Sequence, residues 1–360
     1  MKAIYRYTVA FLAILAIQPA AHRLEAQQRR TPTRVILFIG DGVGIAYWTA
    51  ALFAADALSV QKLPVVGLVD TRSTSYITDS AAGATAYATG VRTYNGAIGV
   101  GPDSLPRKTV LEIARERGLA TGLVATSSIT HATPASFAAH VASRAEEFEI
   151  ASQMARQEIT VLLGGGRRFF DPAQRPDGQD LLGQMLRSYT YVTSPDSLLP
   201  VAKRGPARLL GLFAEQGMPK AMGRSPSLAD MTLAALAVLT RNPEGFFLMV
   251  EGSQPDWRGH ENAPLQEVID EMLDFDQAIG AAIEYQRGRP ETLIVVVADH
   301  ETGGLAIQPD STGMITGGYT TNSHTGEMVP LFAGGPGAER FAGILTSSRV
   351  GELLIEAVKR

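Results

Sequence analysis

The sequence predicts an α/β fold: a three-layer sandwich in which a central, mostly parallel sheet is flanked by helices. Short apolar runs alternate with longer segments of helical periodicity. The runs are continuously apolar, as expected for strands that are buried on both faces of a parallel sheet. At 360 residues, the chain can also bury a large core, and no internal repeat is visible.

The predicted elements follow this alternation. The sequence indicates strands over 35–39, 120–125, 159–163, 245–250 and 293–298. It indicates helices over 46–57, 108–117, 132–141, 146–157, 228–240 and 265–284. Gly118 is a typical helix stop. The stretch 166–226 is rich in Pro, Gly, Arg and Ser, and we interpret it as an irregular excursion from the main domain.

We interpret residues 1–26 as a secretory signal peptide and 27–360 as a single domain. Lys2 and Arg6 give a basic start, and the apolar run that follows, 9–17, is too short to span a bilayer. Small residues then precede a cleavage point. The alternative is an uncleaved N-terminal anchor. The interpretation predicts an exported protein, periplasmic or extracellular, without a later membrane span.

Charge and cysteine content exclude several classes of protein. Removing residues 1–26 takes the formal net charge from −4 to −6, which argues against a nucleic-acid binder. The sequence has no cysteine, so disulfides and thiolate zinc sites are excluded. Any metal must be held by His, Asp, Glu and hydroxyl groups.

Acidic side chains stand where predicted strands end. Asp299-His300 follows the apolar run 293–297, Glu251 follows the strand that ends at Val250, and Asp41 lies in a Gly-Asp-Gly turn after the first strand. The carboxyl edge of an open α/β sheet is where ligands bind. A carboxylate–imidazole pair suits Zn²⁺ or a similar cation. Alone, the Asp-Gly pair at 41–42 would be typical of a simple turn.

Other motifs are weaker taken singly. Ser80 precedes a run of tiny residues; it could cap that helix, or it could present a nucleophile where backbone N–H groups favour a phosphate. Asp256 and His260 would share one face of a helical turn, or form a solvated pair.

The remaining candidates lie in loops or near helix ends. His324 lies in a polar loop. Thr133, two residues after His131, could be a cap, and Arg144 could form a surface salt bridge with Glu146 or Glu147.

Taken together, these segments resemble the alkaline phosphatases. The resemblance runs from about Arg34 to Gly335 in the family's order. It rests on the motifs Gly40-Asp41-Gly42, Thr78-Asp79-Ser80-Ala81-Ala82, His131-Ala132-Thr133-Pro134, Arg144, Glu251 to His260, Ala298-Asp299-His300 and His324-Thr325-Gly326.

The resemblance implies a serine nucleophile, two Zn²⁺ and one Mg²⁺. Ser80 is implied as the residue that becomes phosphoserine, and Arg144 as the phosphate clamp. One zinc is implied at Asp256, His260 and His324. The second is implied at Asp41, Ser80, Asp299 and His300. The magnesium is implied at Asp41, Thr133 and Glu251.

Two positions depart from the family pattern. His131 and Trp257 stand where other members carry Asp or Lys. His131 removes an anion beside the implied magnesium and could itself become a ligand, so the identity of the third metal stays open. Trp257 would change the contacts around bound phosphate. Only 23 residues separate His300 from His324, where many relatives have an insertion.

The resemblance therefore predicts an exported phosphomonoesterase of broad specificity that works at alkaline pH. Its partners would be small phosphate monoesters and inorganic phosphate, and a homodimer is compatible with the family. One alternative is a phosphodiesterase or sulfatase on the same fold. Another is a non-catalytic phosphate- or metal-binding exported protein.

Overall fold

A ten-stranded sheet forms the middle of the structure, which is a computed structural model describing residues 32–359. The predicted signal peptide lies outside the described residues. Every neighbouring pair of strands is parallel except for the two pairs that involve β13. In spatial order the strands are β14 (Gly343–Thr346), β2 (Val65–Asp70), β13 (Val329–Gly334), β8 (Thr292–Val297), β1 (Arg34–Gly40), β7 (Phe246–Gly252), β3 (Ala120–Ser128), β4 (Val161–Gly165), β6 (Leu209–Leu212) and β5 (Thr190–Val192).

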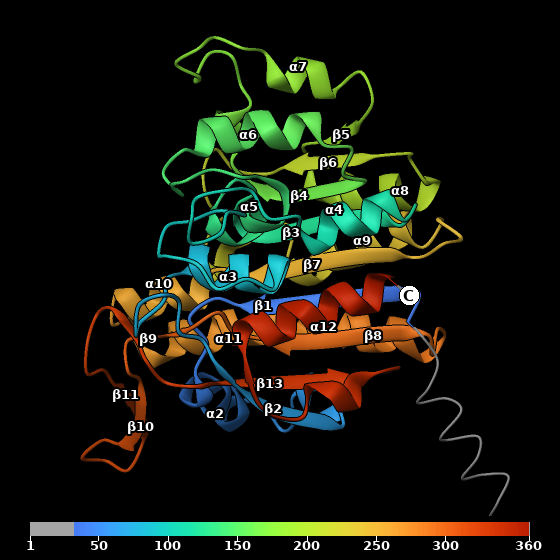
Figure 1. Ribbon diagram of the computed structural model, residues 1–360. Coiled ribbons are helices and arrows are strands. Elements are labelled where there is room, and N and C mark those ends of the chain that lie inside the picture. The colour runs from blue at the N-terminus through green and yellow to red at the C-terminus, as the bar shows by residue number, and fades with distance from the viewer. Residues whose placement is uncertain (1–31, 360) are drawn as a thin grey trace, which may run out of the picture.

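Helices cover both faces of this sheet (Figure 1). One layer contains α3 (Ser80–Thr89), α4 (Val110–Glu116), α5 (Ala132–Ala138) and α12 (Ser347–Lys359). The other contains α2 (Ile45–Ala54), α8 (Pro195–Arg204), α9 (Leu228–Leu239) and α11 (Leu265–Arg287). The predicted three-layer α/β sandwich is confirmed.

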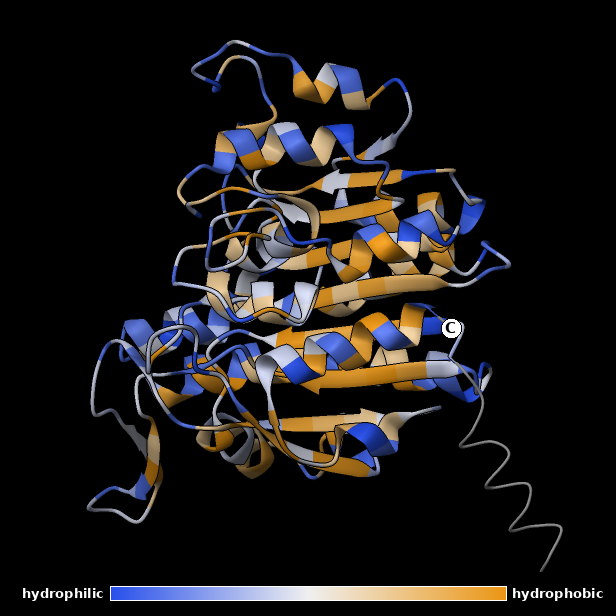
Figure 2. Cartoon of the chain, in the orientation of Figure 1, coloured by the Kyte–Doolittle hydropathy of each residue, from blue (hydrophilic) through white to orange (hydrophobic). Residues whose placement is uncertain are grey.

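The central strands are apolar along their length, as Figure 2 shows. Strands β7 and β8 are buried at every residue, because helices cover both of their faces. Helix α4 begins with a capping box: the Thr109 hydroxyl accepts a hydrogen bond from the Glu112 N–H, and the Glu112 carboxylate accepts one from the Thr109 N–H. This box starts the helix two residues later than the sequence pattern indicated.

The segment 166–226 is more regular than predicted. It contains α7 (Leu181–Met185) and α8, and its two strands β5 and β6 extend the main sheet beyond β4. These strands have only three and four residues, so their apolar runs are too short to recognise among the surrounding Pro, Gly and Arg residues.

The remaining elements lie around the edges of the sheet. They are α6 (Glu147–Arg156), α10 (Gln254–His260), the short strand pair β9 (Glu301–Thr302) with β12 (His324–Thr325), and the hairpin of β10 (Ala306–Pro309) and β11 (Ile315–Gly318). Short 3-10 turns cover 59–62, 167–169, 221–223 and 338–341. Across residues 32–359, we find no helix that combines the length and apolar character needed to cross a bilayer.

Candidate active site

Three adjacent strands bring three acids together. Strand β1 lies between β7 and β8, with Ile39 in register with both Glu251 and Val297. Asp41 leaves β1 just beyond that level, and Asp299 leaves β8. All three carboxyl groups are fully buried. Their convergence at the carboxyl edge of the sheet is the arrangement that the sequence predicted.

A first cluster consists of Asp256, His260 and His324. The predicted helical turn forms α10, which places His260 Nε2 3.3 Å from Asp256 Oδ1. His324, on β12, brings its Nε2 within 3.6 Å of the same oxygen and 3.1 Å from His260 Nε2. Asp256 is buried and only His260 is exposed, so the pair is not the fully solvated one of the alternative interpretation.

A second cluster consists of Asp41, Ser80, Asp299 and His300. His300 Nε2 lies 3.4 Å from Asp41 Oδ1, 3.4 Å from Asp299 Oδ2 and 3.3 Å from Ser80 Oγ. The His300 ring also stacks on that of His324, with ring centroids 3.6 Å apart. The first and second clusters are therefore in contact.

A third cluster consists of Asp41, His131, Thr133 and Glu251. Ligand atoms of Asp41, His131 and Glu251 all lie within 4.8 Å of one another. Thr133 is fully buried on α5, with its hydroxyl beside the Glu251 carboxyl group. The N-cap position of α5 is His131, so Thr133 is not the cap that the sequence alone would suggest.

The histidine rings of the first two clusters present Nε2 as an electron-pair donor. His260 Nδ1 faces the Asn322 carbonyl at 2.7 Å, and His324 Nδ1 faces the Thr78 carbonyl at 2.9 Å. Because a carbonyl can only accept, Nδ1 carries the hydrogen and Nε2 keeps its lone pair in a neutral ring. This is the tautomer that a metal ion requires.

The electrostatics of the buried acids fit divalent cations. Both carboxylate oxygens of Asp41, Oε1 of Glu251 and Oδ2 of Asp299 are buried without a hydrogen-bond partner. Burial, followed by the charges of Asp299, Asp256 and Glu251, raises the pKa of Asp41 well above its usual range. Burial also raises the pKa of Glu251 to about 7 and that of Asp299 to about 6. A cation among them would offset this repulsion.

His300 and His131, in contrast, are held neutral. Burial lowers the pKa of His300 to about 3, and burial together with Arg144 lowers that of His131 to about 3. Neutral imidazoles and ionised carboxylates are the donors that Zn²⁺ prefers where thiolates are absent. The residues present therefore fit the metals that the resemblance implies.

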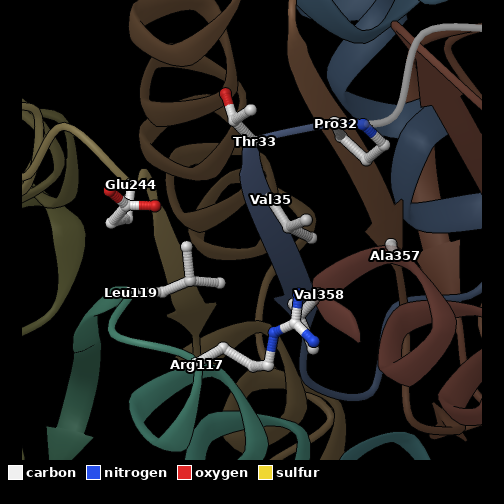
Figure 3. A pocket seen from close by; sticks show the side chains of 8 residues that line it. All are labelled: Pro32, Thr33, Val35, Arg117, Leu119, Glu244, Ala357 and Val358. Atoms are coloured by element: carbon white, nitrogen blue, oxygen red, sulfur yellow. The ribbon is translucent and has the colours of Figure 1, made fainter. Parts of the chain in front are cut away.

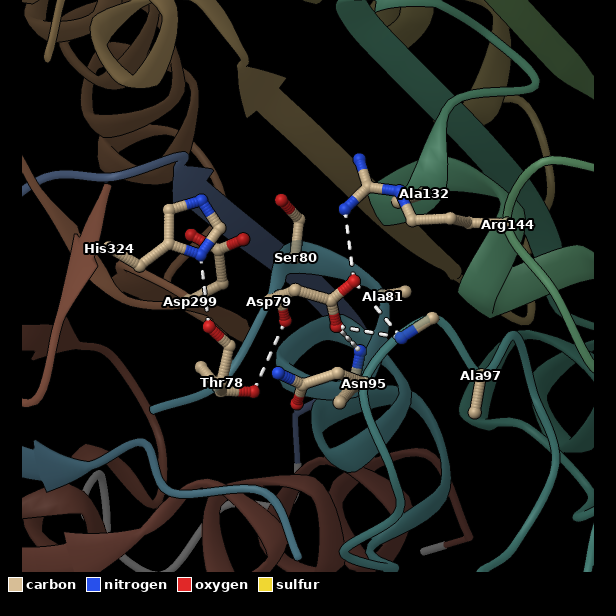
Figure 4. Close-up of polar contacts among 12 residues, drawn as sticks. Thr78, Asp79, Ser80, Ala81, Asn95, Ala97, Ala132, Arg144, Asp299 and His324 are labelled. Atoms are coloured by element: carbon tan, nitrogen blue, oxygen red, sulfur yellow. Dashed lines mark hydrogen bonds and ion pairs between the residues drawn. The ribbon is translucent and has the colours of Figure 1, made fainter. Parts of the chain in front are cut away.

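Ser80 occupies the first position of α3, while Asp79 is its cap. The Asp79 carboxylate accepts hydrogen bonds from the Ala82 and Gly96 N–H groups and from Arg144 Nη1, the last at 3.1 Å. Figure 4 shows the Ser80 hydroxyl between the Asp299 and His324 side chains and the Arg144 guanidinium group. Asp79, not Ser80, is therefore the cap, which leaves the Ser80 hydroxyl free of that role. Arg144 pairs with Asp79 rather than with Glu146 or Glu147, the alternative that the sequence left open.

The two departures from the family pattern touch each other. The Trp257 ring meets the His131 ring edge-on, with centroids 6.3 Å apart, and its far edge lies against Gly217. His131 Nε2 is 3.1 Å from Arg144 Nη2, which can only donate. In this arrangement His131 accepts a hydrogen bond from Arg144, and Trp257 lies behind it.

Sequence reasoning missed two polar residues of the site. Asp79 stood in a quoted motif but was assigned no role, although its preference for helix caps was a usable signal. Thr302 gave no signal. Its hydroxyl donates to Asp256 Oδ1 at 2.5 Å and lies 3.2 Å from His300 Nδ1, so it connects the first and second clusters.

A separate hollow lies at the opposite end of the strands (Figure 3). Its walls include Thr33 and Val35 at the start of β1, Leu119 before β3 and Glu244 before β7. It is at the amino edge of the sheet, far along the strands from the three clusters, so it is not part of the candidate site.

Comparison with known proteins agrees with this geometry. The profile of the alkaline phosphatase family matches residues 33–316. The chain belongs to the alkaline phosphatase family. Its enzyme class is accordingly that of the phosphoric monoester hydrolases.

This member of the alkaline phosphatase family is similar to several known proteins and solved structures. Alkaline phosphatase 3 of Bacillus subtilis is 43% identical over 77% of this chain, and the match spans 62% of that relative's length. Streptomycin-6-phosphate phosphatase of Streptomyces griseus is 36% identical, with 92% of each chain covered. The alkaline phosphatase of the Antarctic bacterium TAB5 has a TM-score of 0.85 at 36% identity, covering 92% of this chain and 99% of its own.

Proposed function

We propose that this alkaline phosphatase hydrolyses a broad range of phosphate monoesters through a phosphoserine intermediate on Ser80. The observation that carries the proposal is the position of the Ser80 hydroxyl. It lies 3.3 Å from His300 Nε2, within a cluster of buried carboxylates and imidazoles, and Arg144 stands across from it. A nucleophile, a cation site and an anion clamp thus meet at one point.

We assign the metal ligands as the family resemblance implies. The first cluster, Asp256, His260 and His324, would hold one zinc. The second cluster would hold another through Asp41, Ser80, Asp299 and His300. Asp41, Thr133 and Glu251 would hold Mg²⁺, for which an all-oxygen set is suited. Bound there, the cations would favour the serine alkoxide and neutralise charge on the entering and departing oxygens.

The protein's own groups supply binding and orientation. Arg144 can grip two phosphate oxygens with its planar fork, and Asp79 holds the guanidinium group in place. Ser80 lies at the amino end of α3, where backbone N–H groups favour an anion. Ser80 would attack phosphorus opposite the leaving alcohol, and water would then release phosphate from the phosphoserine. A monoester has three free oxygens, two for Arg144 and one to face the cation sites, whereas a diester has only two, so the geometry favours monoesters.

The identity of the third metal depends on His131. Its ring belongs to the third cluster, and a nitrogen ligand there would favour zinc over magnesium. Variants of the TAB5 enzyme in which a histidine is replaced by aspartate or glutamate are described with Mg bound in the M3 site. In this chain, the contact of His131 Nε2 with Arg144 competes with ligation through that nitrogen. We propose magnesium at the third site, held by oxygens.

An alkaline optimum follows from the same groups. The proposed ligands work as carboxylates and neutral imidazoles, and burial raises the pKa of Asp41, Asp299 and Glu251. Higher pH therefore favours the charge state that binds the cations, and with it the loaded enzyme. The side chain of His260 is 40% exposed, so the leaving alcohol would face solvent, which supports broad specificity. We also propose export, on the basis of residues 1–26.

The test combines metal analysis with one substitution. Purified protein should contain two zinc and one magnesium per chain and hydrolyse p-nitrophenyl phosphate, and chelation should abolish this activity until metals are restored. Ser80→Ala should retain phosphate binding but lose nearly all turnover. A metal-loaded wild-type protein that leaves the ester intact would rule out the monoesterase. Full phosphate binding without any turnover would indicate a non-catalytic binder.

A further inference from the structure

Arg144 is carried by a loop, so its position depends on what holds that loop. The Arg144 N–H donates to the Gly96 carbonyl at 2.8 Å. Ile98 and Val141 exchange two backbone hydrogen bonds, of 3.1 and 3.0 Å. Residues 94–101 and 139–144 thus lie side by side as two hydrogen-bonded segments, which we call the clamp ladder. Arg144 lies at one end of it.

His140 fastens the clamp ladder to the helices beside it. Its Nδ1 is 2.7 Å from the Gly99 carbonyl, and its Nε2 is 3.0 Å from Glu112 Oε1 on α4. Its backbone is held from α6, because its N–H donates to Gln153 Oε1 and its carbonyl accepts from Gln153 Nε2. Glu112 is fixed in turn by the N–H of Thr109. His140 therefore joins the two halves of the ladder to α4 through its ring and to α6 through its backbone.

Both ring nitrogens of His140 face groups that accept hydrogen bonds. The ring can donate a hydrogen bond to both the Gly99 carbonyl and the Glu112 carboxylate only as an imidazolium, which has two N–H donors. Burial alone would lower the pKa of His140, but the hydrogen bonds to Glu112 and to the Gly99 carbonyl outweigh it and raise that pKa. Of the elements packed against the ring, α4 contributes the charged Glu112. Loop 94–101 and α6 contribute the neutral Gly99 carbonyl and Gln153 amide.

We propose that His140 is a positioning residue for Arg144 and that its protonated form tightens the grip of Arg144 on phosphate. This inference rests on the proposed role of Arg144 as the phosphate clamp. When the ring loses its proton, one N–H remains for two acceptors, so either the link to Gly99 or the link to Glu112 is lost. The grip on phosphate then weakens as pH rises.

The test measures inhibition of the metal-loaded enzyme by inorganic phosphate, with p-nitrophenyl phosphate as substrate. His140→Gln should weaken phosphate inhibition and raise KM by roughly two- to tenfold, the range expected for one lost hydrogen bond. The kcat should change less. Glu112→Gln should act in the same direction, and its side chain can still complete the α4 capping box, which protects the fold. In the wild type, phosphate inhibition should weaken as pH rises through the pKa of His140. The His140→Gln variant should lack this pH-dependent weakening.

Two controls separate positioning from a general loss of stability. Glu116→Gln, on the same helix, removes an exposed ion pair with Lys108 and should leave inhibition unchanged. In an Arg144→Ala background, His140→Gln should have no further effect on phosphate inhibition. If the wild type is active and His140→Gln leaves phosphate inhibition unchanged, the inference alone is overturned. The same holds if His140→Gln weakens phosphate inhibition as much in the Arg144→Ala background as in the wild type. A wild type that neither hydrolyses the ester nor responds to phosphate would overturn the proposed function as well.

Discussion

Thr302 shows how much one hydroxyl group can organise. Its N–H donates to the Gly42 carbonyl, and its own carbonyl accepts from the Tyr47 hydroxyl. Its side chain donates to Asp256 and accepts from His300 Nδ1, because that hydroxyl has already given its hydrogen to a carboxylate. This fixes the His300 tautomer, with Nε2 free to face Ser80. Thr302 thus orients one proposed ligand of each zinc site.

Thr302→Val should keep the shape of the side chain and remove both contacts. Asp256 would lose a donor and His300 would lose its tautomer lock, so we expect metal affinity or activity to fall by about 10- to 100-fold. Competition with a zinc chelator and kcat/KM would measure the effect. Thr121→Val is the matched control, because the Thr121 hydroxyl is buried without a partner. Equal losses in both variants would contradict the role given to Thr302.

Among single residues, the sequence predicts the proposed metal ligands better than the residues that hold those ligands in position. Asp41, Glu251 and Asp299 could be found because strand ends in a parallel sheet share one edge, a rule that needs no coordinates. Thr302, Asp79 and His140 act through contacts between segments that are distant in the chain. His140 and Glu112, for example, are 28 residues apart. No periodicity connects such positions, so the fold must be known first.

Among the elements, the turn after β1 has the strictest backbone requirement. Gly42 has φ +71, and a Cβ there would lie 2.8 Å from the Asp256 Cα atom and 2.8 Å from Thr302 Oγ1. Position 42 therefore requires glycine for two reasons: its left-handed backbone and the close approach of α10. Both requirements place Asp41 beside the first cluster.

Gly42→Ala should be compared with Gly118→Ala, which also has positive φ, +79, but open space around its Cβ. The control should cost about 1–2 kcal/mol of unfolding free energy, the cost of a side chain in this backbone region. Gly42→Ala should cost more and should also weaken metal binding, because α10 must move. Denaturant unfolding of metal-loaded protein, with metal analysis, measures both. If the two variants lose the same stability, the proposed close contact does not matter.

The predictability of elements follows from their length and surroundings. Strand β8 and helix α11 were recognisable because long apolar or periodic stretches are bounded by clear breaks. The strands β5 and β6 were missed because pairing with β4, rather than their own composition, makes them strands. The sequence predicted that Asp256 and His260 share one face of a helical turn, but not that Asp256 is buried. That burial depends on the packing of α10 against β9 and on the contact with His324 of β12.

At the scale of the whole molecule, the sheet holds acids that repel one another. Strand order places Asp41, Glu251 and Asp299 on three neighbouring strands and buries them all. A fold that collects ionised carboxylates in this way is stabilised by the cations that they bind, because ligands that bind only the folded state add to its stability. The stability of the enzyme and its proposed chemistry therefore depend on the same residues.

Chelation should consequently make stability fall as pH rises from about 5 to 7, the range that leads up to the raised pKa values of Glu251 and Asp299. Burial raises the pKa of Glu251 to about 7 and that of Asp41 well above its usual range, so the folded chelated protein binds protons that the unfolded chain has released. A group of this kind stabilises less as pH rises. His131 and His300, whose pKa burial lowers to about 3, oppose this trend below their ordinary value of about 6.5, and they do so in both forms because each ring stays neutral in the folded protein. His140, with its raised pKa, loses stabilisation with rising pH in both forms, so the difference between chelated and metal-loaded protein isolates the acids.

In the metal-loaded form these carboxylates are already ionised, and the fall in stability with rising pH should be smaller. Thermal melting at pH 5, 6 and 7, with and without chelator, measures both slopes, and parallel slopes would show that the buried acids do not carry the cations.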